Sequence, residues 1–189
     1  MGILRRDSCK APRIRATKGS QMNLNSDVLP VLRHYLGQID KLLRIEGVGD
    51  ALDTRLSKDA LSVGEHLRTA QGFALRTLLP PLGQKVPALG TENCDLAGLK
   101  QRSKEVAHIL HHLEHEDLTA VQPVQHKAGF AELTQSSSDY VMMFGLPNFM
   151  FHFATAHACL RSTGLDIGKA HFDGLHDYPA GFSWVPKTV

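Results

Sequence analysis

Asn148 and His152 lie four residues apart in an otherwise apolar run, residues 146–161, of this 189-residue chain. In a helix, that spacing places both side chains on one face, where they would point into a core. A buried amide or imidazole without a partner costs about 1–3 kcal/mol. Each of the two must therefore form a hydrogen bond or bind a metal ion. The pair marks a candidate site but does not specify a reaction.

A second group of candidate ligands lies between residues 108 and 115. The pairs His108/His112 and His111/His115 have the i, i+4 spacing with which one helix face can chelate a divalent metal. The sequence positions no carboxylate or cysteine to complete a closed site. A solvated helix face is therefore the favoured interpretation of these histidines.

Three further reactive side chains have plainer interpretations. Cys159 follows His152 by seven residues on a similar face, but no cation beside it would lower its pKa, so a buried apolar thiol is favoured. His157 lies about 140° around the helix from His152 and suits a contact with a neighbouring helix or subunit. His176 and Asp177 could form an orienting pair in a loop, yet no nucleophile adjoins them.

The composition indicates one globular domain. Hydrophobic residues make up 42% and charged residues 21%, which is ordinary for such a protein. No apolar run approaches the roughly 18–20 residues that span a bilayer, and no secretory signal is recognisable. We expect a cytoplasmic protein without a membrane partner. Cys9, Cys94 and Cys159 have no metal-ligand spacing and are expected to be free thiols.

Charge is distributed unevenly along the chain. Residues 1–21 hold six basic and one acidic side chain, a net +5, whereas the remainder carries a net −3. We expect residues 1–21 to be a disordered basic extension and residues 22–189 to form the domain, which begins at Met22. A slightly acidic body argues against a nucleic-acid partner, which would require basic residues clustered on the folded surface.

The elements that must position these side chains are helical. Hydrophobic spacing of three and four predicts helices over about 25–47, 59–79, 95–113 and 139–161. The expected boundary signals are one of residues 25–27 as the first cap with Pro30 in the first turn, Asp59 as the cap of the second helix, Pro80-Pro81 as its stop, and Pro147 as a kink in the last helix. Residues 80–94 read as a long crossover, and residues 121–133 as a small hairpin or irregular insertion. The fold class is therefore all-α, a four-helix bundle.

The C-terminal tail, residues 165–189, is rich in aromatic residues and is expected to pack over the bundle end or a partner subunit. Together with Phe149, Phe153 and His157, this tail offers more aromatic surface than four helices need to cover. Contiguous exposed patches of this kind usually mark an interface. We therefore expect a homodimer, isologous by the usual preference.

Three segments carry a resemblance to a known family. The letters LPNFMFH at 146–152, LRSTG at 160–164 and GK at 168–169 resemble the C-terminal signature of an uncharacterised bacterial family, typically LPNFYFH followed by LRxxGV and GK. That domain of unknown function belongs to the DinB/YfiT-like superfamily of helical bundles. Arg55-Leu56 and the segment 71–74 resemble the family's RL…DFA pattern, so the resemblance covers about residues 22–174.

The resemblance implies a metal site, but one whose ligands differ from those of related members. Related members carry one histidine on the second helix and an HxxxH pair on the fourth, and some are thiol-dependent transferases. Alignment on the terminal Leu-Arg places His152 on the second histidine of that pair and Asn148 on the first, while His66 falls in the region of the second-helix histidine. A carboxamide is a weaker donor than imidazole, so the implied zinc or nickel site is degenerate.

Two functions follow as hypotheses. The first is a DinB-like bundle whose helices two and four enclose a small-molecule or degenerate metal pocket lined by His66, Asn148 and His152. The alternative is a non-enzymatic structural or interaction protein in which Asn148 and His152 form a buried hydrogen bond. The chain contains no G-x-S-x-G, phosphate-loop or dinucleotide motif, so neither a hydrolase nor a nucleotide enzyme has motif support.

Overall fold

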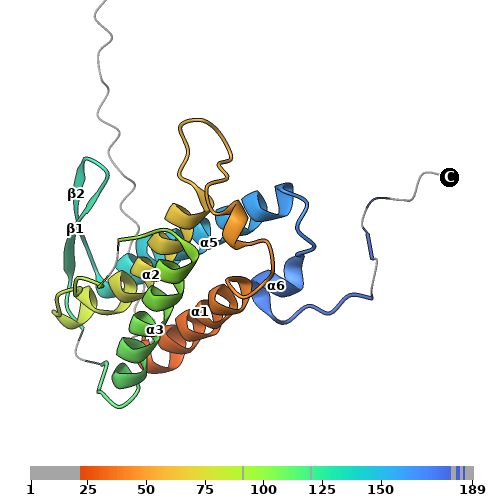
Figure 1. Cartoon of the computed structure of the whole chain (residues 1–189). Helices are drawn as coiled ribbons and strands as arrows, with labels where there is room; N and C mark the ends of the chain where they lie inside the picture. Colours follow the sequence, from red (N-terminus) through yellow and green to blue (C-terminus); the bar gives the residue numbers. More distant parts are fainter. Residues whose placement is uncertain (1–21, 91, 120, 180–181, 184, 186–189) are drawn as a thin grey trace, which may run out of the picture.

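The computed structural model describes residues 22–90, 92–119, 121–179, 182–183 and 185. The expected basic extension, residues 1–21, and Trp184 lie outside the described residues. Four long helices form the body: α1 (Leu29–Leu42), α2 (Val63–Leu78), α3 (Leu96–Leu113) and α5 (Leu146–Ser162). They lie side by side as a bundle (Figure 1), which confirms the predicted all-α fold class. None of the helices in the described ranges is long and apolar enough to cross a bilayer.

Helix α2 is central to the bundle, because it packs against α1, α3 and α5 and most extensively against α5. It positions one half of the candidate site and α5 positions the other. The continuous core around α2 comes from all four helices and includes Leu32, Ile39, Leu67, Leu75, Leu99, Leu110, Phe149 and Phe153.

The helix boundaries confirm some predicted signals and correct others. The Pro80-Pro81 pair ends α2 as expected, in the short 3-10 helix η3 (Pro80–Leu82). The structure adds that Asp95, near which the third helix is predicted to begin, caps α3 by accepting a hydrogen bond from the Gly98 amide at 2.7 Å. Asp59 does not cap α2. Ser62 does, in a capping box with Glu65, because the backbone is extended at Ser62 and enters the helix only there.

The first helical segment begins earlier than predicted and ends earlier. A π-helical turn, η1 (Leu24–Val28), precedes α1, and the side chain of Asn23 caps it. Pro30 lies in the first turn of α1, as expected. After Leu42 the chain turns through Gly47, whose φ of 81° favours glycine, and the 3-10 helix η2 (Gly49–Ala51) follows.

The predicted insertion is a regular hairpin. Strands β1 (Val124–Ala128) and β2 (Ala131–Gln135) pair antiparallel, with Val124 opposite Gln135. In Figure 1 the hairpin projects from one side of the bundle.

The fourth helical segment is interrupted by a change of helix type. It consists of α4 (Ser137–Asp139), the π-helix η4 (Tyr140–Gly145) and then α5, with Pro147 at the start of α5. The predicted break at Pro147 is thus a π-helical stretch just before the proline. Gly145 lies against α2 so closely that a Cβ there would be 2.7 Å from Thr77 Oγ1. Glycine at this position lets the two elements approach.

The tail begins by packing against its own bundle. Helix α6 (Lys169–Asp173) lies against α1, and the ring of Phe172 stacks on that of Phe153 with centroids 4.7 Å apart. Phe149 and Phe153 are fully buried. The premise that these two aromatic side chains form surplus exposed surface is therefore wrong, because α6 and the bundle cover them.

Candidate functional site

His66 and His152 meet between α2 and α5. Their Nδ1 atoms are 2.8 Å apart, so one ring donates a hydrogen bond and the other accepts it. His66 is only 4% exposed and His152 is partly buried. The two residues are 86 positions apart in the chain, and the close packing of α2 against α5 is what joins them.

Aromatic rings surround this pair. The ring of Phe73 stacks on His152 at 5.8 Å, and Phe151 meets His66 edge-on at 6.2 Å. The guanidinium of Arg76 lies over the ring of Phe73, 5.2 Å from its centroid, within the range of a cation–π contact. The pair therefore lies in a largely apolar setting with one cation beside it.

This setting keeps both imidazoles neutral. Burial lowers the pKa of His66, an effect that the charge of nearby Glu65 opposes. Burial lowers the pKa of His152 to about 4, and electrostatic interactions with the His66 imidazole and the Arg76 guanidinium act in the same direction. A neutral imidazole is the form that hydrogen-bonds to a second imidazole or ligates a metal.

Asn148 has a different partner from the one expected. Its amide nitrogen donates to the backbone carbonyl of Phe144 at 2.7 Å, one turn earlier in the π-helix. The acceptor lies at the end of η4, where the backbone changes from π-helical to α-helical hydrogen bonding. The hydrogen bonds of the two side chains thus go to other partners than the Asn148–His152 pair that the alternative hypothesis assumed, and each side chain is hydrogen-bonded.

The described residues bring no third histidine, cysteine or carboxylate to this pair. Among them, a group of three such ligands occurs at another place, formed by His111, Glu114 and His115. Asn148, whose free amide atom is an oxygen, remains the side chain on the same α5 face that could add a donor.

The histidines of α3 are exposed, as the sequence predicts, but their surroundings differ. Leu110 and Leu113 face the core while the histidines face solvent. The sequence indicated no carboxylate beside them, yet Glu114 Oε2 lies 3.0 Å from His111 Nδ1. The i, i+3 spacing of those two residues was the available signal, and it was missed.

The remaining candidates have structural roles. Cys159 is buried, and burial raises the pKa of its thiol, which argues against a nucleophile. His157 bonds to the Gly168 carbonyl at 2.9 Å, within its own chain. His176 pairs with Asp173 and not with Asp177, the partner considered from the sequence, since His176 Nδ1 lies 2.5 Å from Asp173 Oδ2. Asp173 also accepts the amides of residues 175 and 176 and so closes the end of α6.

Comparisons with known proteins agree with this fold. Residues 22–173 match the family described as a domain of unknown function, DUF1993. A crystal structure of a DinB family member protein from Shewanella denitrificans is similar, with a TM-score of 0.66 and 21% identity over 80% of this chain and 92% of that one. At that identity the likeness supports the fold alone. The comparison with curated proteins gave no match.

Proposed function

We propose, for a chain that belongs to the DUF1993 family, that His66 and His152 bind a divalent metal ion, zinc or nickel, and that the ion holds a small-molecule ligand between α2 and α5. The observation that carries the proposal is the 2.8 Å approach of the two Nδ1 atoms. Zinc ligands at about 2.0–2.1 Å in a tetrahedral arrangement lie roughly 3.3 Å apart, so a small opening of the pair suffices.

The electrostatics of the pair support the same function. Both imidazoles are neutral at pH 7, since the pKa of each is lowered. Neither ring therefore has to lose a proton before a metal cation binds. Asn148 uses its amide nitrogen on Phe144, and its Oδ1 is the atom that would complete the donor set. When bound, a zinc-class ion supplies a Lewis acid and lowers the pKa of a coordinated water.

The donor set is weaker than a three-histidine site, because a carboxamide oxygen is a neutral, weak ligand. This property supplies a gain-of-function test. Asn148→His restores the HxxxH pair, and we expect it to tighten zinc binding at least about tenfold, since imidazole is the better ligand for that ion.

Metal titration of untagged protein by calorimetry tests the proposal. The background should carry His111→Ala and His115→Ala, so that the exposed α3 cluster does not contribute. In that background, His66→Ala and His152→Ala should each lose the bound equivalent, while His157→Ala, a control on the same helix, should keep it. Retention of one equivalent by both site variants would eliminate the metal site.

A second candidate function is structural, and one observation favours it. His66, His152 and Asn148 each already have a hydrogen-bond partner within the chain, so the pair can act as a latch between α2 and α5. A double-mutant cycle on the two histidines in metal-free protein measures this latch. Coupling of about 1 kcal/mol with no metal uptake by the wild type would favour the structural function.

A further inference from the structure

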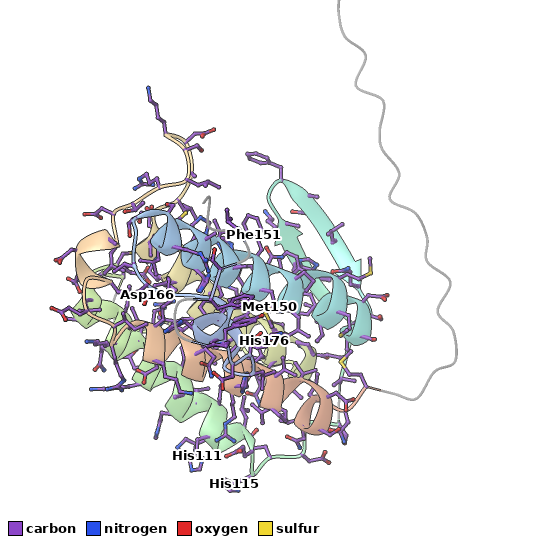
Figure 2. The ribbon with its side chains drawn as sticks, turned by 90° about the vertical axis from the view of Figure 1, so that its right-hand side faces the viewer. His111, His115, Met150, Phe151, Asp166 and His176 are labelled. Atoms are coloured by element: carbon purple, nitrogen blue, oxygen red, sulfur yellow. The ribbon has the colours of Figure 1, made fainter. Side chains whose placement is uncertain are left out.

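The last turn of α3 brings three metal-ligating side chains together outside the site described above. The ligand atoms of His111, Glu114 and His115 all lie within 4.8 Å of one another. The rings of His111 and His115 face each other edge-on with centroids 5.4 Å apart. Figure 2 shows the two labelled histidines at the edge of the molecule, away from Phe151 and the α2–α5 contact.

Glu114 is held in position by a second helix. One of its oxygens, Oε1, forms an ion pair with Arg33 of α1, while Oε2 faces His111 Nδ1 at 3.0 Å. With Oε1 bound by the guanidinium, the carboxylate is oriented to offer Oε2 as a single ligand atom. Groups that do not touch the metal often orient its ligands in this way. The ion pair also ties the end of α3 to α1.

Two further features favour a cation here. The three ligands surround the C-terminal end of an 18-residue helix, Leu96–Leu113, where the helix dipole is negative. Glu114 and Arg33 also line a surface groove of 610 Å³ between the start of α1 and the end of α3. A solvent molecule can therefore reach the ion from that side.

We propose that His111, Glu114 and His115 bind one divalent ion of the zinc class. A water molecule would complete the coordination of the ion. Two imidazoles and a carboxylate are a donor set that zinc accepts with one position open. The order His-x-x-Glu-His also occurs in zinc peptidases, where the glutamate acts as a base. Here all three side chains are exposed and form no substrate-enclosing wall, so the inferred activity is ion binding that stabilises the last turn of α3.

The neighbouring pair His108 and His112 is the competing site on the same helix. Their Nε2 atoms are 3.1 Å apart, but within the described residues no carboxylate or cysteine joins them as a third ligand. Two exposed imidazoles bind more weakly than three ligands, so the matched control for the proposed site is His112→Ala.

Zinc titration of the full, untagged chain carrying His66→Ala and His152→Ala tests this site independently of the proposed function. We expect one equivalent to bind, and we expect His111→Ala, His115→Ala and Glu114→Gln each to weaken the dissociation constant at least tenfold. His112→Ala should change it by less than twofold. Circular dichroism would verify that each exposed substitution leaves the fold intact.

Thermal unfolding with and without zinc supplies the second measurement. Zinc should raise the melting temperature of the parent protein by several degrees and leave that of the combined His111→Ala, His115→Ala variant unchanged. Loss of binding in His112→Ala with retention in His111→Ala would overturn the assignment in favour of the neighbouring pair. Failure of the parent to bind zinc at all would overturn the site itself.

Discussion

His152 illustrates how the setting of one residue controls its chemistry. Its ring lies between the stacked Phe73 and the neutral His66, and its pKa is lowered to about 4. An unfolded histidine titrates near 6.5. The unfolded chain therefore binds a proton in a pH range where the folded chain does not.

Protein stability should consequently fall as the pH is lowered from about 6.5 to about 4. The folded pKa is below the unfolded one, so the stabilisation is fully present above pH 6.5 and is lost as the pH falls toward the folded pKa of about 4. Allowing for partial solvent screening, the loss is roughly 1–3 kcal/mol. Urea unfolding at pH 7, 6, 5 and 4 measures it. His152→Gln should flatten the slope, and an unchanged slope in that variant would assign the effect to other groups.

Asn148 makes a different contribution, since it donates to a backbone carbonyl inside an irregular turn. Removing that donor should lower the free energy of unfolding by about 1 kcal/mol. Asn148→Ala and Asn148→Asp both remove it, and the aspartate keeps the shape of the side chain. Chemical denaturation compares them. Full stability of the aspartate variant would show that the Phe144 carbonyl needs no amide partner.

At the scale of elements, the local end signals of helices decide where α2 and α3 begin. Ser62 caps α2, and its backbone amide donates a hydrogen bond to the Glu65 carboxylate at 2.7 Å, which lowers the pKa of Glu65. Asp59, three residues earlier, accepts from the Ser57 hydroxyl in the preceding turn. The predicted cap, Asp59, was wrong because aspartate and serine are about equally favourable cap residues, so propensity alone does not point to Ser62.

Substitution at the two positions distinguishes the caps. Ser62→Ala should lower the free energy of unfolding by about 1 kcal/mol, since it leaves the Glu65 amide without its acceptor. Asp59→Ala is the matched control and should change stability by less than about 0.5 kcal/mol. Denaturant melts measure both, and a larger loss in the Asp59 variant would reverse the assignment.

The elements also show what could be read from the sequence. Apolar spacing and proline positions predicted four helices and a small hairpin or irregular insertion before the last helix, because these features depend on local residues. The meeting of His66 with His152 came from the family resemblance, since 86 residues separate them. The partner of Asn148 could not be predicted, because it depends on a π-helical stretch that no local propensity specifies. Helix α6 was missed because five residues carry too short a periodicity.

At the scale of the whole molecule, α6 closes one end of the bundle. Phe172 stacks on buried Phe153 and lies 5.6 Å from the ring of Tyr35. His34 of α1 also contacts the Asp173 carbonyl at 2.6 Å. The start of the tail therefore belongs to the core of the fold.

Phe172→Ala should lower the free energy of unfolding by about 2 kcal/mol, because it removes a partly buried aromatic side chain and exposes Phe153. Phe130 at the hairpin tip is fully exposed, so Phe130→Ala is the control and should have no measurable effect. Thermal unfolding of the two variants checks this. Equal melting temperatures would mean that α6 adds nothing to stability.

The homodimer remains a prediction, and its physical basis has changed. Phe149 and Phe153 are buried, whereas Met142, Met143 and Phe151 are each more than half exposed on the outer side of η4 and α5. Sedimentation equilibrium at micromolar concentration measures the mass of the assembly, and a monomer there would exclude the dimer. Phe151→Glu should shift a dimer toward monomer, since it introduces a charge into the remaining apolar surface.

The π-helical stretch η4 affects which residues of the segment 137–162 face the bundle. Buried residues occur at positions 141, 145, 149 and 153, a constant step of four. In an uninterrupted α-helix each residue turns the axis by about 100°, so three such steps would drift by roughly 120°. The wider π turns absorb part of that drift and keep Val141 and Phe153 on the same bundle-facing side. Deleting one residue from 142–144 should therefore restore α-helical winding and still leave Val141 within roughly 20° of Phe153. Winding the same number of residues as a plain α-helix would instead turn Val141 away from α2 by roughly 120°.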